Sequence, residues 1–464
     1  MKIADKSTTA VSLVEASLKR IEETKDFHIF TFVDRDRALK KAKEIDARIA
    51  KGENPGRLAG VPYALKANFL SKNRPADASA KILTEFISPV DSTTAEKLNQ
   101  EGAICVGCVN LDAFAHGSST ENSYYGPTKN AKDKTRVAGG SSGGSAVAVA
   151  LDCVQFATGS DTGGSIRQPA SFNGVFGIKP TYGTVSRYGV VAMASSLDVI
   201  GFFTKTATDL DLLMSITAGQ DEKDQTTLPD FYGTNDVELK KKSIGYVKEF
   251  MNSPALDAEI KSALESKLET FKNKGYKIVE LSMPTLEYAL AAYYIIQPAE
   301  VASNLSRYDG VRYGFRTDNL KAEDKTPLDL LFENTRDEGF MRENKRRIMI
   351  GNFVLSSGFY DAYFLKAAKA RTKIIDEFNT AFEQVDAILS PVSPNPAFKL
   401  GEKVSDPVAM YLEDVMSVPV NLAGVPAVAF PVGENKAGLP LGLQIIGPRR
   451  SDKNLINLAG ELAK

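Results

Sequence analysis

Two glycine- and serine-rich runs hold the residues best suited to chemistry in this chain of 464 residues. They are Gly-Gly-Ser-Ser-Gly-Gly-Ser at 139–145 and Ser-Asp-Thr-Gly-Gly-Ser at 160–165. Glycines let backbone amides approach a ligand closely and leave a serine side chain unobstructed. Such tracts are most often flexible linkers, but the apolar segments 146–151 and 154–158 predict a helix and a strand that hold both runs in a core. We therefore expect serine chemistry.

Histidine, the usual base of serine enzymes, is scarce, because the chain has only His28 and His116. The first run fits the G-x-S-x-G pattern of the α/β-hydrolase nucleophile elbow, but those enzymes place histidine after the serine. Both histidines precede Ser141, which excludes that order. Enzymes that place histidine first leave His116 as a candidate base, provided that an aspartate partner exists. His28 fits a structural or surface role.

A lysine kept neutral by burial can replace histidine as the base. Lys66 follows the apolar segment 58–65, which is typical of a buried strand. A lysine at the end of such a strand is costly unless it has a partner or a task. The lysines at 40–41 and 240–242 lie in polar segments typical of solvated surface. Lys66 is therefore the candidate base.

These segments together resemble the amidase signature family. The resemblance rests on Lys66, on the run at 139–145, and on Gly-Ser-Asp-Thr-Gly-Gly-Ser-Ile-Arg-Gln-Pro-Ala at 159–170. It implies a catalytic set of Lys66 as base, Ser141 in a cis peptide as proton relay, and Ser165 as nucleophile. The spacing of the two serines agrees with the family.

The second run also offers donors for an oxyanion. Backbone N–H groups at Thr162, Gly163, Gly164 and Ser165 are the natural hole for the tetrahedral intermediate of acyl transfer. The side chains of Asp161 and Thr162 fit a chemical role and a turn cap equally well, so the sequence leaves both interpretations open.

Within the family, longer segments are similar to the glutamine-hydrolysing subunits of tRNA-dependent amidotransferases. The implied reaction is attack of Ser165 on the side-chain amide of glutamine, release of ammonia, and hydrolysis of the acyl-enzyme to glutamate. The alternatives are a free-standing amidase acting on another small amide and a catalytically silent subunit. The segments that carry the resemblance are 114–122, 179–183, 186–189, 304–310, 345–348 and 419–424.

Free glutamine is a zwitterion, so its pocket needs a cation for the carboxylate and an anion for the ammonium group. The resemblance implies Arg347 and Asp414 in these two roles, with Tyr293 as a wall or hydrogen-bond partner. Arg346 and Glu413 are competing neighbours. A plain surface ion pair would account for either charge as well.

The resemblance also implies the partners. A B subunit would use ATP and Mg²⁺ to activate and amidate misacylated Glu-tRNA(Gln) or Asp-tRNA(Asn), and a small C subunit would brace the pair. We expect no cofactor and no metal in this chain, which has no G-x-x-x-x-G-K-[ST] phosphate-binding loop. Its net charge of −1 provides no basic footprint for nucleic acid, so tRNA should contact mainly the B subunit.

Two positions depart from the family pattern. Ala67 follows Lys66 where an aspartate is usual, and Ala113 stands where the family commonly has glutamate. An acid near Lys66 would favour its charged form, so these replacements fit either a more readily neutral lysine or weakened activity. Because Lys66, Ser141 and Ser165 are intact, we predict an active enzyme.

Composition and cysteine usage indicate an ordinary soluble protein. The chain is 43% hydrophobic and 25% charged, and no apolar run approaches the roughly 20 residues of a membrane span. The N-terminus lacks the apolar core of a secretory signal, so we expect a cytoplasmic protein or one of an organelle matrix. Cys105 and Cys108 form a C-x-x-C pair in an apolar strand segment, which favours a core position over a metal site.

The alternation of short apolar strands with helices indicates a layered α/β fold. The resemblance implies a single large domain over 1–464, with a mixed central β-sheet covered by helices on both faces and an N-terminal helical segment at about 1–55. Surface loops are expected over the polar stretch 206–242. Helices are expected at 11–21, 37–50, 254–274 and through much of 284–385, and strands at 58–66, 103–107, 244–247, 277–281, 427–431 and 441–446.

Overall fold

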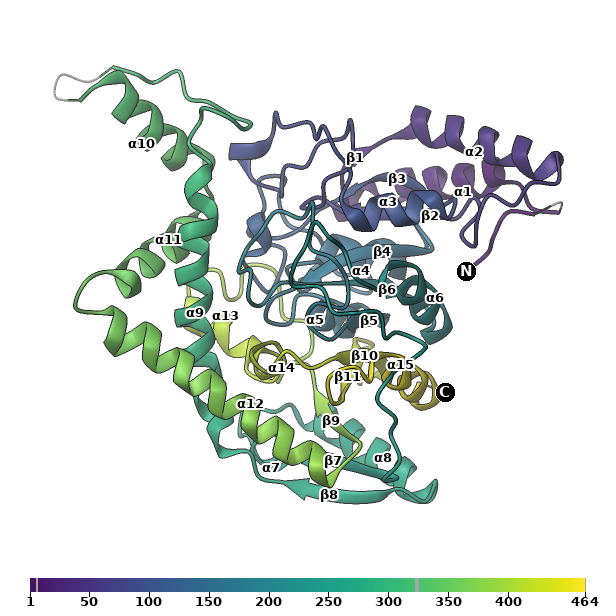
Figure 1. Cartoon of the computed structure of the whole chain (residues 1–464), viewed down its shortest axis with the longest axis vertical. Coiled ribbons are helices and arrows are strands. Elements are labelled where there is room, and N and C mark those ends of the chain that lie inside the picture. The colour runs from purple at the N-terminus through teal and green to yellow at the C-terminus, as the bar shows by residue number, and fades with distance from the viewer. Residues whose placement is uncertain (6, 322–324, 464) are drawn as a thin grey trace.

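The computed structural model describes residues 1–5, 7–321 and 325–463. Their strands form an eleven-stranded sheet that crosses the molecule (Figure 1). The strands are β1 (Phe30–Val33), β2 (Pro62–Lys66), β3 (Ile104–Val109), β4 (Phe156–Asp161), β5 (Phe176–Lys179), β6 (Val199–Thr204), β7 (Ser243–Val247), β8 (Lys277–Leu281), β9 (Ala387–Pro391), β10 (Ala427–Glu434) and β11 (Pro440–Ile446).

The sheet is mixed, as expected, with the spatial order β1-β3-β2-β4-β6-β5-β10-β11-β9-β7-β8. Strand β2 pairs in parallel with β3 and β4, and β7 pairs in parallel with β8 and β9. The strands between these two groups are antiparallel to their neighbours. The late strands β10 and β11 thus lie in the middle of the sheet and join its two halves.

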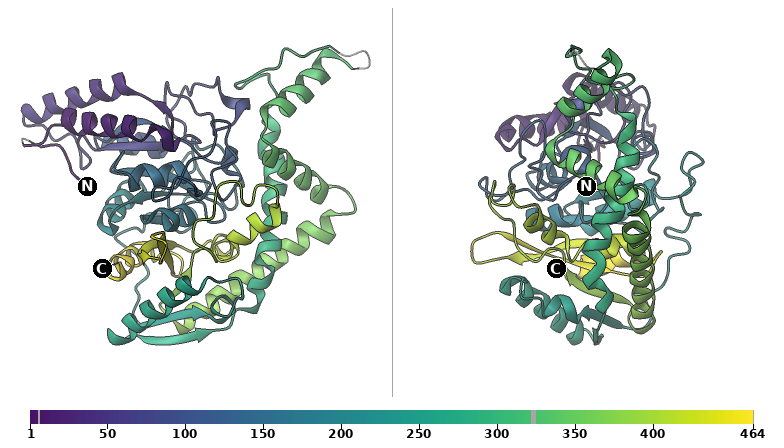
Figure 2. Two further views of the ribbon diagram at one scale, coloured as in Figure 1. Left: turned by 180° about the vertical axis from the view of Figure 1, so that it is seen from behind. Right: turned by 90° about the vertical axis from the view of Figure 1, so that its left-hand side faces the viewer.

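Helices cover both faces of the sheet (Figures 1 and 2). Several begin at capping side chains, such as Thr9 before α1 and Asp257 before α8, which accept hydrogen bonds from the first free backbone amides. The helices are α1 (Ala10–Glu23), α2 (Arg35–Ala50), α3 (Thr93–Gln100), α4 (Gly143–Ala150), α5 (Arg167–Asn173), α6 (Ala207–Thr217), α7 (Lys248–Met251), α8 (Ala258–Asn273), α9 (Ala289–Asn304), α10 (Pro327–Gly339), α11 (Arg342–Leu355), α12 (Lys366–Gln384), α13 (Pro407–Tyr411), α14 (Val418–Ala423) and α15 (Asp452–Leu462).

Neighbouring residues of the central strands enter different hydrophobic clusters, as the two-residue period of a strand requires. Tyr63 and Phe156 pack with α3, α6, α8 and α15 on one face, and their ring centroids lie 5.0 Å apart. The next residues, Ala64 and Ala157, pack with α1, α2, α4 and α5 on the other face. Because both faces are covered, every residue of β2 and β4 is buried.

Most of the predicted elements are present, with one exception in the polar stretch. Helices α1, α2 and α8, the helices of 284–385, and strands β7, β8, β10 and β11 lie where the sequence patterns indicate. Surface loops were expected throughout 206–242, but α6 occupies Ala207–Thr217. Its Leu210, Leu213 and Met214 are buried against the sheet, which offsets the polar composition of the segment as a whole.

Candidate active site

The end of strand β2 brings Lys66 beside strand β4. Because β2 and β4 run in parallel, with Ala64 opposite Ala157, Lys66 reaches the end of β4, where the second glycine-serine run begins. Its side chain is fully buried. The amine lies 2.9 Å from Ser141 Oγ and 2.9 Å from Ser160 Oγ. Both runs thus meet at the one lysine that the sequence pattern identified as a candidate base.

Burial lowers the pKa of Lys66 to about 7, although the carboxylates of Asp112, Asp161 and Asp198 favour its charged form. A substantial fraction of this amine is therefore neutral at neutral pH. Lys66 has the properties that a base requires, namely a lone pair and a hydroxyl group within hydrogen-bonding distance.

Ser141 lies in the loop before α4, and its peptide bond to Gly140 is cis. Two neighbours fix that peptide: the Asp112 amide donates to Ser141 O at 3.2 Å, and the Gly140 amide donates to Gln168 Oε1 at 3.0 Å. An added Cβ on Gly140 would lie 2.1 Å from Asp112 Oδ2. The loop therefore has room only for glycine before the relay serine.

Ser165 lies in the turn between β4 and α5, and its carbonyl accepts the Ser142 amide at 3.2 Å, which ties the two runs together. Its residue is 8% exposed, whereas Lys66 and Ser141 are closed to solvent. Within the described part of the chain, the Ser165 hydroxyl makes no hydrogen bond. It is thus the hydroxyl of the three residues that remains open to a substrate.

Asp161 caps the turn that carries Ser165. Its carboxylate accepts the amides of Gly164 at 2.9 Å and Ile166 at 3.0 Å, and it forms a fully buried ion pair with Arg167. Burial alone would raise the pKa of Asp161, but Arg167 overrides this effect and holds the pKa at about 2. The turn-cap interpretation of Asp161 is confirmed, and Gly164, expected as an oxyanion donor, directs its amide to that cap instead.

The remaining amides of the turn, at Thr162, Gly163 and Ser165, make no hydrogen bond to the described residues. The Thr162 side chain donates to Asp198 at 2.7 Å and thereby also serves the turn. A Cβ on Gly163 would lie 2.7 Å from the Tyr293 hydroxyl oxygen. Tyr293 therefore packs directly over the turn, where the sequence predicted a wall of the substrate pocket.

His116 has no part in this cluster. Its Nδ1 contacts Asn344 Nδ2 at 2.9 Å and Ala113 O at 3.3 Å. Burial and the nearby Arg347 guanidinium lower the pKa of His116 to about 3. In the described structure no hydrogen bond joins it to a serine, so the arrangement does not support a histidine base.

Arg347 projects from α11 into a buried environment and is 3% exposed. Its guanidinium donates to Glu343 Oε1 at 2.7 Å and to Gln297 Oε1 at 2.6 Å. It also lies 4.6 Å from the ring centroid of Tyr294. The neighbouring Arg346 pairs with Glu343 as well but is more exposed. Arg347 is thus the arginine held in a fixed interior position.

Asp414 and its competitor Glu413 differ in their partners. Glu413 is paired with Lys403. Asp414 accepts hydrogen bonds from Ser118 Oγ at 2.8 Å and from the Tyr294 hydroxyl at 2.9 Å, and no cation pairs with it among the described residues. Burial raises the pKa of Asp414 to about 6. A buried carboxylate held by neutral donors is suited to receive a ligand's ammonium group.

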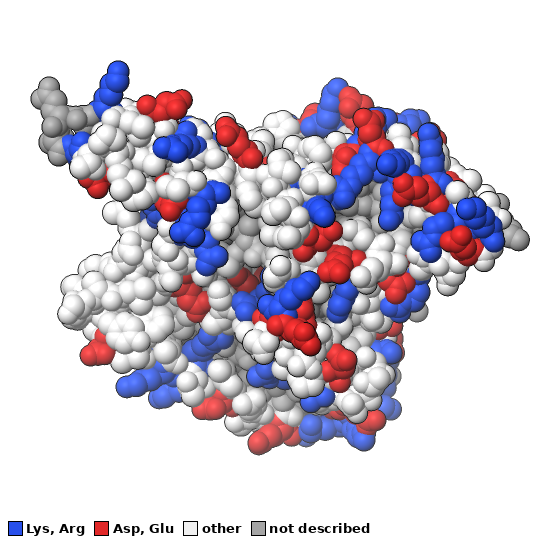
Figure 3. All heavy atoms as spheres, turned by 45° about the horizontal axis from the view of Figure 1, so that its top comes forward, with Lys and Arg blue, Asp and Glu red and all other residues white. Residues whose placement is uncertain are grey.

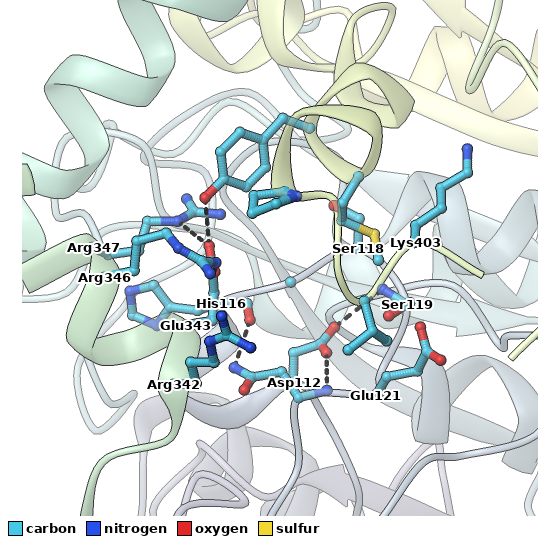
Figure 4. A pocket seen from close by; sticks show the side chains of 16 residues that line it. Asp112, His116, Ser118, Ser119, Glu121, Arg342, Glu343, Arg346, Arg347 and Lys403 are labelled. Carbon is cyan, nitrogen blue, oxygen red and sulfur yellow. Dashed lines mark hydrogen bonds and ion pairs between the residues drawn. The ribbon is translucent and has the colours of Figure 1, made fainter. Parts of the chain in front are cut away.

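A pocket of about 150 Å³ lies on this side of the site (Figure 4). Arg347 and Ser118, which binds Asp414, both line it. Figure 4 shows the arginines of α11 on one side and the loop with Ser118 and Ser119 on the other. The expected carboxylate and ammonium partners thus border the same region.

Sequence reasoning missed several residues that hold this site. Ser160 received no role, although the parallel pairing of β2 and β4 places it beside Lys66. Glu343 precedes Arg347 by one helical turn, which is a detectable signal. Ser118, Tyr294 and Gln297 carried no such signal, because only the tertiary fold brings them to Asp414 and Arg347.

The two departures from the family pattern are accommodated as apolar core. Ala67 and Ala113 are fully buried in one hydrophobic cluster with Cys108 and Leu111. Cys105 belongs to a different cluster, so the C-x-x-C pair is core, as predicted. Among residues 1–5, 7–321 and 325–463, no three histidine, cysteine, aspartate or glutamate side chains gather as metal ligands would.

Comparison with known proteins agrees with this geometry. The amidase family model matches residues 12–456. The chain therefore belongs to the amidase family, as its motifs predicted.

Within that family, the chain is similar to the A subunits of glutamyl-tRNA(Gln) amidotransferases along nearly its whole length. It is 48% identical to the protein of Carboxydothermus hydrogenoformans, over 99% of this chain and 94% of that protein. It is 49% identical to that of Thermosynechococcus vestitus, over 99% and 95%. The crystal structure of the Thermotoga maritima protein of the same name has a TM-score of 0.78 at 39% identity and covers 97% of this chain and 90% of that one.

Membrane association has no counterpart in the fold. None of the helices in the described part of the chain is long and apolar enough to cross a bilayer.

Proposed function

We propose that this chain is the glutaminase subunit of a tRNA-dependent amidotransferase, with Lys66, Ser141 and Ser165 as its catalytic residues. The observation that carries the proposal is the contact between the buried Lys66 amine and the Ser141 hydroxyl at 2.9 Å. A buried, partly neutral amine beside a serine is the arrangement needed to activate a second serine without histidine.

Orientation of the lysine supports this role. A neutral amine has two N–H groups and one lone pair. Ser160 offers both Oγ, at 2.9 Å, and its carbonyl oxygen, at 3.4 Å, as acceptors. With both N–H groups directed to Ser160, the lone pair faces Ser141. Ser141 can then pass its proton to Lys66 as it takes the proton of Ser165.

The reaction then follows in balanced steps. Ser165 Oγ attacks the side-chain amide carbon of glutamine while its proton moves through Ser141 to Lys66. The proton returns to the leaving nitrogen, ammonia departs, and a glutamyl ester of Ser165 remains. Water, activated by the same relay, hydrolyses that ester to glutamate. The amides of Thr162, Gly163 and Ser165 are the donors available to the two oxyanions.

Substrate recognition rests on Arg347, Asp414 and Tyr293. Arg347 would bind the α-carboxylate of glutamine and Asp414 its α-ammonium group, with Tyr293 packing over the turn of Ser165. A buried charge pair of this kind selects a free amino acid over a neutral amide, because the neutral amide leaves both groups unpaired.

The partners follow from the relatives' names. A B subunit using ATP and Mg²⁺ would receive the ammonia and amidate Glu-tRNA(Gln) or Asp-tRNA(Asn), and a C subunit would brace the assembly. No cofactor is assigned to this chain, and the cytoplasm or an organelle matrix is its proposed location. A free-standing amidase is the second candidate, since the same three residues would cleave another small amide. The zwitterion partners Arg347 and Asp414 favour glutamine.

A glutaminase assay on the chain co-purified with B and C subunits tests the proposal. Ser165→Ala should abolish glutamate release while the subunits still assemble. Ser171→Ala is the matched control, because its buried hydroxyl donates to Gly442 O at 3.4 Å, away from the relay. Glutamate release by Ser165→Ala at the wild-type rate would remove Ser165 as the nucleophile, and equal activity on simple neutral amides would favour the free-standing amidase.

A further inference from the structure

The connection between α11 and α12 forms an exposed apolar projection, which we call the hairpin patch. The π-helical turn Tyr360–Leu365 lies in this connection. Seven large apolar side chains between residues 349 and 365 are 36% to 72% exposed. They are Met349, Phe353, Leu355, Phe359, Tyr360, Tyr363 and Leu365.

The aromatic rings of the patch pack on one another rather than into the core. The ring centroid of Phe353 lies 4.3 Å from that of Phe359 and 5.9 Å from that of Tyr363. Tyr360 contacts Phe364 at 5.2 Å. The projection is therefore an ordered surface, and its exposed rings do not stabilise the central sheet.

The size of the patch matches an interaction surface. At about 200 Å² for each fully exposed large side chain, these fractions amount to roughly 600 Å² of exposed surface. A monomer's largest apolar patch usually reaches only about 300–600 Å². A standard interface buries about 800 Å² on each partner, so the patch alone could form most of one.

Charge around the patch indicates the kind of partner. In Figure 3 the hairpin projects at the left as a bulge on which white atoms dominate. Asp361 is its acidic residue, whereas Lys366, Lys369 and Lys373 follow it along one exposed face of α12. No salt bridge joins these lysines to an acid in the described structure. A complementary partner would carry an apolar face continued by acidic side chains.

The patch and the candidate active site share a helix. Helix α11 carries Glu343 and Arg347 in its first half and Met349 and Phe353 in its second. It crosses α9 closely, because a Cβ on Gly351 would lie 1.9 Å from Pro298 O. A partner seated on the patch would therefore hold the helix that positions the substrate-binding arginine.

We propose that the hairpin patch is the docking site for an apolar, acid-flanked segment of a partner subunit, and that this contact fixes α11 and with it Arg347. The inference rests on the proposed function, since it places an amidotransferase partner on this surface. It adds a location and a consequence: assembly and glutamine affinity should depend on the same hairpin.

Assembly of the full chain with co-expressed B and C subunits tests the inference. The double variant Met349→Glu/Phe353→Glu should bind at least about thirtyfold more weakly, the effect of losing one interface hot spot of about 2 kcal/mol. Leu328→Glu, on α10, is the control because its exposure of 57% is comparable. Circular dichroism and the thermal unfolding midpoint verify that each variant is folded.

A second variant keeps the test independent of folding. Lys366→Glu/Lys369→Glu changes only exposed charges and should slow association at low salt, with the difference shrinking as salt rises. Normal assembly by both double variants would overturn the inference while leaving the proposed function standing. Failure of the wild-type chain to bind B and C subunits would overturn the proposed function itself. Concentration-dependent dimerisation that Met349→Glu/Phe353→Glu abolishes would assign the patch to a second copy of this chain instead.

Discussion

The Lys66 amine lies 2.9 Å from the Ser141 hydroxyl oxygen, and both side chains are closed to solvent. Base and relay are therefore joined before any substrate arrives, while the nucleophile Ser165 is the part of the set that a substrate can reach. This separation keeps water from solvating the amine, which is the condition that lowers its proton affinity.

Glutamine hydrolysis should rise as pH increases through about 7. Burial holds the pKa of Lys66 near that value, so the amine is charged and inactive as a base below it and neutral above it. The folded state also binds fewer protons than the unfolded state from about pH 7 to the ordinary lysine value, so stability should increase with pH across that window. A kcat/KM profile that is flat across neutral pH would contradict the lysine base.

Loss of the base should be far more damaging than loss of the buried histidine. Lys66→Ala should reduce kcat by about a thousandfold or more, in the range seen when a proton-transfer residue is removed. His116→Ala should retain most of the activity, because His116 contacts Asn344 and Ala113 rather than a serine. A dead His116→Ala variant that still folds would revive the histidine-based mechanism.

Arg347→Ala should raise the KM for glutamine and leave amidation with free ammonia unchanged. Loss of one charge-assisted contact of about 1.5–3 kcal/mol corresponds to an increase of roughly 10- to 150-fold. Arg346→Ala is the matched control on the same helix turn, since its side chain is more exposed. Equal effects of the two variants would place the carboxylate site elsewhere.

Asp161→Ala should destabilise the fold by about 3–5 kcal/mol, because it leaves the buried Arg167 guanidinium without its carboxylate. The ion pair is fully buried at 3.1 Å. Asp337→Ala, which removes an exposed pair with Lys345, should cost at most about 1 kcal/mol. Urea unfolding measures both. Similar losses for the two variants would mean that Asp161 does not hold the turn.

The sequence by itself determined the chemistry and much of the architecture. The scarcity of histidine, the two glycine-serine runs and a lysine at the end of an apolar strand indicated serine chemistry with a lysine base. Periodicity indicated α1, α2 and α8, since amphipathic spacing is a local property. The polar stretch that became α6 was misjudged, because its buried leucines are outnumbered by solvated neighbours.

Tertiary structure alone decided which polar groups meet. It placed Ser160 beside Lys66 through parallel pairing of β2 and β4, and it assigned Glu413 to Lys403 while leaving Asp414 with Ser118 and Tyr294. It also gave the Gly164 amide to Asp161. Such contacts join residues distant along the chain, and burial, which sets their charge, exists only once the chain has folded.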